Sequence, residues 1–275
     1  MASLAGTLLD NDAYEFLVKD QLTVHKPNGE LLFIYLPHVI SPYIAARAIV
    51  SLRLAAKTTN NRGSAAGPRH YPVKKNGTRS RTDTSPSVQS GVVGFLDRNS
   101  RFPYCRMTEF GHDNPIGLAA VMPILQQLDD YFRAFVPERW MAQMKACDAT
   151  DADWVFPHTP FTTVTVNRNF QTAVHKDVGD LKEGFGVMTA FGHGYRGGYL
   201  CFPEYGVAVD MREGGVLFAD VHEWHGNTPI VPFTPTWERL SLVCYYREHM
   251  KDCGSAEEEL RRAKGRVKGD PIRGK

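Results

Sequence analysis

"FGVMTAFGHGYRGGYLCFPEYGVAVDMREGGVLFAD", residues 185–220, decides the fold class. The stretch is a series of short apolar runs, rich in aromatic and β-branched residues, with glycines between them. Similar runs occur at 161–167 and 238–246. Short strands at even spacing, separated by turn residues, are typical of a β-sandwich or barrel. The sequence therefore predicts a β-barrel core over residues 155–250.

The residues before this core have a mixed pattern. An apolar run at 31–40 indicates a strand, and residues 42–56 have helical periodicity. Residues 116–147 fit one helix, or two helices broken at Pro137. We expect an α+β fold in one domain of residues 1–275. Its parts are N-terminal helical and strand support (1–154), the barrel core (155–250), and a helix with a basic tail (251–275) in which Ser255 and Glu258 form a capping box.

Composition excludes several classes of protein. The chain has 275 residues, of which 43% are hydrophobic, and it contains no apolar run of about 18 residues, so no membrane span is expected. The N-terminus lacks the pattern of a signal peptide. The five cysteines are scattered without a CxxC pair, which favours a reducing compartment over a disulfide or zinc framework. We expect a monomer that is not secreted, nuclear in a eukaryote and cytoplasmic in a bacterium or virus.

Basic residues are concentrated in two segments. Residues 57–90 and residues 261–275 each hold seven Lys and Arg against one Asp, although the net charge of the whole chain is only +2. Such segments on an acidic body suggest a polyanionic partner. The alternative is a pair of disordered, solubilising segments, which is the more common meaning of a charge run. The composition of 57–90 also predicts a long mobile insertion.

Two short motifs suggest a metal site. In "AVHKDVGD" (173–180), His175 and Asp177 are two positions apart and would share one face of an extended chain. "DVHEWHGNTPI" (220–230) adds His222 and His225, which are three apart and so do not form the HExxH zinc motif. In a strand these two would face opposite ways, and we choose His225 because the Gly-Asn after it makes a turn at a strand end. Two imidazoles and one carboxylate form the facial triad of non-haem iron oxygenases, with open positions for a co-substrate and O2.

A 2-oxoacid co-substrate also needs a cation for its far carboxylate. Arg239 lies in the next predicted strand among apolar neighbours, where a guanidinium is unfavourable unless it meets an anion. Ser241 shares its face. Each element alone is weak, because HxD occurs by chance, a lone His usually makes an ordinary hydrogen bond, and a strand Arg is often on the surface. Together in one barrel they predict an iron- and 2-oxoglutarate-dependent dioxygenase.

Three stretches resemble the catalytic domain of the TET/J-binding-protein (TET/JBP) dioxygenases. They are "VTVNRNFQTAVHKDVGDLKEGFGVMT" (164–189), "GGYLCFPEYGVAVDMREGGVLFADVHEWHGNT" (197–228) and "RLSLVCYY" (239–246). Residues 90–108 weakly resemble the upstream substrate loop of that family. The resemblance implies a double-stranded β-helix (jelly-roll or cupin-like) barrel with preceding helices, and Fe(II)- and 2-oxoglutarate-dependent oxidation of methyl groups on DNA pyrimidines. It also implies a catalytic domain without the additional DNA-binding modules of larger relatives.

The resemblance assigns roles to individual residues. It gives His175, Asp177 and His225 to iron, and Arg239 to 2-oxoglutarate. Ser241, Asn167 and Arg168 are expected near the co-substrate, and Asp180, Arg247, Asn99 and Trp224 on the side of the target base.

The chemistry suits a methyl group of DNA. A pyrimidine methyl C–H is not acidic enough for a side-chain base, so an oxidising iron centre is required. The base must be flipped out of the duplex, and Trp224, Tyr195 or Phe161 could replace the lost stacking. An ionised Asp180 would accept from the N4 amino group of cytosine, which favours oxidation of 5-methylcytosine to 5-hydroxymethylcytosine and beyond. Thymine hydroxylation and N6-methyladenine demethylation remain alternatives, as do a protein or small-molecule hydroxylase and a non-catalytic DNA-binding barrel.

Overall fold

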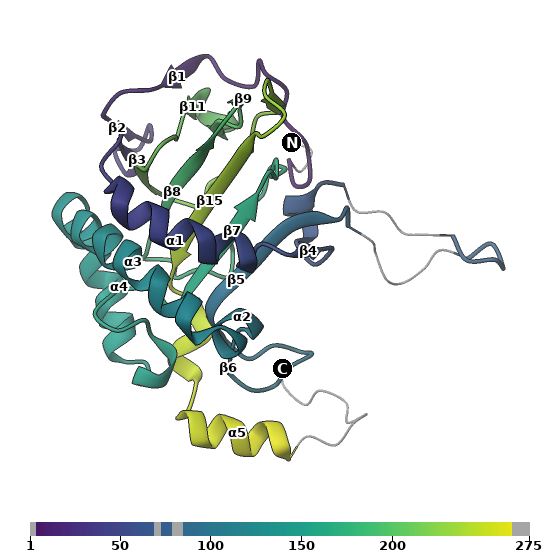
Figure 1. The fold of residues 1–275 in the computed structure, drawn as a ribbon, viewed down its shortest axis with the longest axis vertical. Helices are drawn as coiled ribbons and strands as arrows, with labels where there is room; N and C mark the ends of the chain where they lie inside the picture. The colour runs from purple at the N-terminus through teal and green to yellow at the C-terminus, as the bar shows by residue number, and fades with distance from the viewer. Residues whose placement is uncertain (1–3, 69–72, 79–84, 266–275) are drawn as a thin grey trace.

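The computed structural model describes residues 4–68, 73–78 and 85–265. Two β-sheets face one another, and helices cover the outer face of the larger sheet (Figure 1). This is the α+β, double-stranded β-helix architecture that the sequence predicts. Among the residues that the structure describes, no helix has the length and apolar character needed to cross a membrane.

The larger sheet supplies most of the scaffold. Its strand order is β2-β3-β12-β8-β15-β7-β5-β4, with β6 paired to β5, and the pairs are antiparallel. In that order the strands are β2 (Leu22–His25), β3 (Leu31–Leu36), β12 (Gly215–Ala219), β8 (Gly186–His193), β15 (Glu238–Tyr245), β7 (Thr163–Arg168), β5 (Val88–Leu96), β4 (Thr58–Thr59) and β6 (Arg106–Met107).

The smaller sheet lies across the core from these strands. Its order is β1-β11-β10-β13, in which β1 and β11 are parallel, and a separate antiparallel pair joins β14 to β9. The strands are β1 (Phe16–Val18), β11 (Val207–Val209), β10 (Leu200–Phe202), β13 (Gly226–Asn227), β14 (Ile230–Pro232) and β9 (Tyr195–Gly197).

Helices α1, α3 and α4 pack on the larger sheet, and α5 lies apart from them near the C-terminal end (Figure 1). The helices are α1 (Pro42–Ala55), α2 (Glu109–Asp113), α3 (Pro115–Phe135), α4 (Pro137–Asp148) and α5 (Ala256–Lys264). The predicted break at Pro137 is the first residue of α4, where a proline needs no N–H partner. The predicted capping box of Ser255 and Glu258 starts α5.

Alternation along the strands separates two cores. On β12, Val216 and Phe218 face the cluster under the helices, whereas Leu217 and Ala219 face the cluster between the sheets. The same period of two runs along β15, where Leu240 and its even-numbered neighbours join the helix-side core. The odd-numbered side chains of β15 therefore face the space between the sheets.

The structure corrects three expectations about the chain's organisation. The sheets are not confined to 155–250, because β3 and β5 pair with barrel strands in the larger sheet and β1 extends the smaller one. Segment 57–90 is not an insertion without structure, since it contains β4 and the 3-10 helix η1 (Gly63–Ala66). Cysteines also form a disulfide, Cys105–Cys253, with a Cα–Cα distance of 5.9 Å.

Several residues of the two basic segments lie outside the described residues. They are Arg69, Arg79, Arg81, Arg266, Lys268, Arg273 and Lys275.

Candidate iron and co-substrate site

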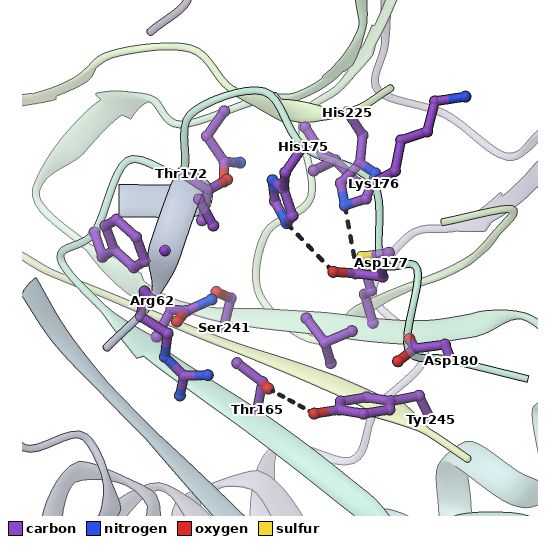
Figure 2. A pocket seen from close by; sticks show the side chains of 18 of the residues that line it. Arg62, Thr165, Thr172, His175, Lys176, Asp177, Asp180, His225, Ser241 and Tyr245 are labelled. Carbon is purple, nitrogen blue, oxygen red and sulfur yellow. Dashed lines mark hydrogen bonds and ion pairs between the residues drawn. The ribbon is translucent and has the colours of Figure 1, made fainter. Parts of the chain in front are cut away.

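His175, Asp177 and His225 meet between the two sheets. One ligand atom from each residue lies within 4.8 Å of the others. His175 Nε2 is 3.5 Å from Asp177 Oδ1, and His225 Nε2 is 3.6 Å from Asp177 Oδ2 (Figure 2). The backbones of His175 and His225 exchange two hydrogen bonds, of 2.9 and 3.0 Å. This bridge fixes the two imidazoles side by side, although they are far apart in sequence.

Hydrogen bonds also set which ring nitrogen is free. Nδ1 of His175 lies 2.8 Å from the carbonyl oxygen of Ala173, and Nδ1 of His225 lies 2.9 Å from that of Glu223. A carbonyl can only accept, so each Nδ1 carries a proton, and in the neutral form of each imidazole the lone pair lies on Nε2, toward Asp177. In metal-binding histidines, the ring nitrogen that does not bind the metal commonly donates its proton to such an acceptor.

The charges of the three groups fit a divalent metal. Burial alone would raise the pKa of Asp177, but His175 and His225 together lower it to about 2. Burial lowers the pKa of His175, whereas contact with Asp177 raises the pKa of His225 against the effect of burial. An ionised carboxylate with two imidazoles is the donor set of the iron facial triad. These residues therefore fit an Fe(II) ion, which would sit among the two Nε2 atoms and the carboxylate.

His222 lies outside this group. Its Nδ1 is 3.3 Å from Asp220 Oδ1, and its Nε2 is 3.3 Å from the carbonyl oxygen of Asp180. The strand alternation used to choose between the histidines does not apply, because β12 ends at Ala219 and the chain turns at 221–223. It is the bridge to His175 that brings His225 to the carboxylate.

A buried lysine, together with two carboxylates, stabilises this turn. Lys26, directly after β2, lies 2.7 Å from Asp220 Oδ2 and 2.8 Å from Glu223 Oε1, with 9% of its side chain exposed. These two carboxylates raise the pKa of Lys26 against the effect of burial. Because the carbonyl of Glu223 also meets His225, Lys26 supports the backbone that positions this imidazole. No sequence pattern indicated it, since Lys26 and Asp220 are 194 positions apart.

Arg239 sits at the inner end of the same cavity. The side chain is 2% exposed, and Nη1 donates to Ser241 Oγ at 3.2 Å. Its Nε has no hydrogen-bond partner, and no carboxylate within the described part of the chain forms an ion pair with it. Burial lowers its pKa. A guanidinium buried in this way fits an incoming carboxylate such as that of 2-oxoglutarate.

The cavity that joins these groups has a volume of about 460 Å³. Asn167 on β7 lines it, with Oδ1 accepting from Ser90 Oγ at 2.6 Å. Arg168, the next residue, does not line it, because alternation turns its side chain to the other face. There its Nε donates to Glu238 Oε1 at 2.9 Å. The expected co-substrate contact of Arg168 is therefore wrong.

Asp180 and Arg247 lie on the opposite side of the cavity from Arg239. Their backbones form a β-bridge, and Arg247 Nε donates to Asp97 Oδ1 at 2.7 Å. Burial and the charge of Asp177 raise the pKa of Asp180 well above its ordinary value. Both side chains line the cavity, so it offers an acid and a guanidinium at this end.

Tyr245 adds an aromatic ring to this wall. It lines the cavity, and its hydroxyl lies 3.1 Å from Thr165 Oγ1 (Figure 2). The sequence interpretation missed it, although it continues the alternation of Arg239 and Ser241 along β15. Extending that period of two by four residues would have found it.

The other expected base contacts lie elsewhere. Asn99 accepts backbone N–H groups of Arg101 and Phe102 at 3.0 and 2.9 Å, so it stabilises a turn. Trp224 does not line the cavity and packs in a small apolar cluster beneath Lys176.

Two further aromatic residues proposed for stacking are buried away from the mouth. Phe161 stacks on Phe132 in the helix-side core. Tyr195 is 2% exposed beside Arg212, and it lies near Arg239. Neither ring can stack on a base.

Arg62 is an unexpected cavity residue from the basic segment 57–90. Its Nη2 donates to the carbonyl oxygen of Gly91 at 2.8 Å, and its Nε is buried without a partner. Only its charge was visible in the sequence, because nothing there indicated that η1 folds against the barrel.

Comparisons with known proteins agree with this geometry. Residues 93–248 match the family Tet_JBP, described as the oxygenase domain of the 2OGFeDO superfamily. Thymine dioxygenase JBP1 of Trypanosoma brucei brucei is 35% identical over 197 residues, covering 70% of this chain and 23% of the relative. Thymine dioxygenase JBP1 of Leishmania infantum is 31% identical over 248 residues, covering 88% and 28%. The chain thus spans about a quarter of the length of these relatives.

A solved structure shows a similar fold. NgTET1 in complex with 5mC DNA aligns with a TM-score of 0.60 and 16% sequence identity, covering 95% of this chain and 91% of that one. At this identity the likeness concerns the fold.

Proposed function

Because the chain belongs to the Tet_JBP family of 2OGFeDO oxygenase domains, we propose that it hydroxylates the methyl group of a 5-methylpyrimidine in DNA. Fe(II), 2-oxoglutarate and O2 are the cofactor and co-substrates of this superfamily. When bound, they supply the oxidising chemistry that a methyl C–H requires. The observation that carries the proposal is one cavity that joins the His175–Asp177–His225 group to a buried arginine without an anion.

Different residues of the cavity would bind the metal and the co-substrate. His175, Asp177 and His225 would hold Fe(II), with the two Nδ1–H groups fixed on backbone carbonyls. Arg239 and Ser241 would hold the far carboxylate of 2-oxoglutarate. Binding of the co-substrate and the base between the sheets would exclude water, which strengthens these contacts and protects the reacting centre.

The opposite wall would hold the flipped base. The ring of Tyr245 offers an apolar face, while Asp180 and Arg247 offer polar contacts. The ionised form of Asp180 can accept from the N4 amino group of 5-methylcytosine, the base favoured by the sequence, whereas the protonated form, which its raised pKa favours, can donate to O4 of thymine. Thymine is the second candidate, since Arg247 can donate to its O4 and since the curated relatives reported above are named thymine dioxygenases.

Nucleoside mass spectrometry tests the proposal. The protein is incubated with Fe(II), 2-oxoglutarate and a duplex that carries both thymine and 5-methylcytosine. We expect an oxidised base, either 5-hydroxymethyluracil or 5-hydroxymethylcytosine, together with DNA-stimulated release of succinate. His225→Ala should produce no oxidised base and no succinate. DNA-independent succinate release without an oxidised base would instead support a hydroxylase of a protein or small molecule.

The basic segments would bind phosphates. The described part of the tail places Arg261, Arg262 and Lys264 on the last turns of α5. Deleting 266–275 should weaken binding to all DNA sequences and flatten the log K against log salt slope by about 0.9 for each lost contact. Asp180→Ala should do the reverse, changing the ratio of oxidised bases with little effect on the slope. One chain supplies every group of the cavity described above, so a monomer would suffice.

A further inference from the structure

Val178 is an apolar side chain displayed at the mouth of the cavity. It is 82% exposed, yet it lines the cavity between the candidate iron ligand Asp177 and the candidate base contact Asp180. Single exposed apolar residues are common on protein surfaces and need no explanation by themselves. Here the position is the informative feature, because the exposed side chain belongs to the lining of the cavity that a flipped nucleotide would enter.

The backbone around Val178 is held on both sides. The N–H of Asp177 donates to the carbonyl of Val221 at 2.9 Å, and the N–H of Glu248 donates to the carbonyl of Gly179 at 3.0 Å. Asp180 then bridges to Arg247. Val178 therefore lies at the tip of a short turn whose two ends are fixed to the barrel, and it cannot fold back into the core.

Local structure gives no reason for a valine at this position. Turn positions favour Gly, Asn, Asp, Ser and Pro, each for a backbone reason, and a β-branched apolar residue has none of these advantages. With most of its surface exposed, it also adds little to the packed core. A polar residue should fold equally well here, so the side chain is best explained by something that binds over the cavity.

The surroundings suit nucleic acid. Lys176 lines the same cavity, and its side chain extends away from the metal group (Figure 2). A cation beside an apolar tip matches a phosphate backbone beside a base stack.

We propose that Val178 is a wedge that enters the base stack of duplex DNA where the target base has been flipped out. The inference rests on the proposed function. Flipping leaves an unstacked gap that is unfavourable by a few kcal/mol, and proteins that distort DNA commonly insert apolar side chains between bases. Val178 would occupy that gap while Asp180 and Tyr245 contact the flipped base inside the cavity.

Comparing DNA forms separates a wedge from other roles. Val178→Ser removes the apolar contact and Val178→Leu retains it, while Val231→Ser on β14, 48% exposed, is the matched control. Each variant is tested on the same target strand as a matched duplex, as a duplex with a mismatch at the target, and as single-stranded DNA. We expect Val178→Ser to lower kcat/KM roughly tenfold on the matched duplex, less on the mismatch, and not on the single strand, where no stacking gap must be filled. Val178→Leu and Val231→Ser should retain activity on all three.

A second readout does not need turnover. 2-Aminopurine beside the target base should become brighter when the protein binds the duplex, and Val178→Ser should reduce this rise. An equal loss on single and double strands, or no loss on any DNA, would overturn the wedge and leave the proposed function standing. Failure of the unaltered protein to oxidise any of the three DNA forms would overturn both.

Discussion

Replacing Arg239 by methionine should abolish most 2-oxoglutarate binding without destabilising the protein that lacks co-substrate. The guanidinium is 2% exposed, has an unpaired Nε and forms no ion pair within the described residues. An uncompensated buried charge is unfavourable, so an apolar side chain of similar length should leave the unliganded fold at least as stable. The same charge is an advantage once an anion arrives.

The size of the effect follows from the contact that is lost. Truncating one partner of a buried, hydrogen-bonded charge pair weakens binding by about 2–5 kcal/mol, which raises Kd roughly 30-fold to a few thousand-fold. With 2-oxoglutarate at 100 times the wild-type Kd, the ligand stabilises the wild type by about 2.7 kcal/mol. A 100-fold weaker variant would gain only about 0.4 kcal/mol. For a chain of this size these values correspond to Tm rises of about 5–10 °C and about 1 °C.

Thermal unfolding with and without 2-oxoglutarate, under anaerobic Fe(II), measures both halves of this prediction. Arg239→Lys should recover part of the shift, because an ammonium keeps the charge and loses the two-pronged contact. Arg168→Met is the control, since Arg168 pairs with Glu238 outside the cavity and its loss should leave the 2-oxoglutarate shift intact. A full shift in Arg239→Met, or a lost shift in Arg168→Met, would refute the assignment.

The remaining predictions concern the metal and the stability of the fold. His225→Ala should abolish Fe(II) binding in equilibrium dialysis while His222→Ala retains it, and the opposite result would reverse the choice of ligand. Lys26→Met removes the ammonium that Asp220 shares with the half-buried Glu223, so the unfolding free energy in urea should fall by about 3 kcal/mol; an unchanged midpoint would show that the cluster contributes nothing. The bond between Cys105 and Cys253 closes 148 residues, which is worth up to about 5 kcal/mol of chain entropy, so a reductant should lower Tm and have no further effect on Cys253→Ser.

Patterns within one strand or one helix could be predicted from the sequence. The Gly-separated runs indicated the barrel strands, Pro137 marked the start of α4, and alternation placed Ser241 on the face of Arg239. Each of these depends on residues a few positions apart. The periods of strand and helix are properties of the backbone, so they can be recognised in a sequence without knowing which segments pack against the strand or helix.

Contacts between distant segments were not predictable in this way. Asp97, which holds Arg247, and Lys26, which supports the turn before His225, act across most of the chain. Asn99 and Trp224 carry side chains suited to contacting a base, but Asn99 stabilises a turn and Trp224 packs in an apolar cluster. Residue type gives the chemistry that a side chain could perform, whereas strand pairing decides whether it reaches the cavity.

Strand β15 explains why the cavity can serve two ligands. Arg239 and Ser241 face the proposed co-substrate end, and Tyr245 on the same side of the same strand faces the proposed base end. Six residues of extended chain separate Arg239 from Tyr245 by about 20 Å, with the metal group on the opposing segments between them. The spacing between the two subsites is thus fixed by backbone geometry and not by any one contact. Inserting a single residue within β15 would move each side chain beyond it to the opposite face of the sheet, which turns Tyr245 toward the helix-side core, so it should abolish base binding even with all iron ligands in place.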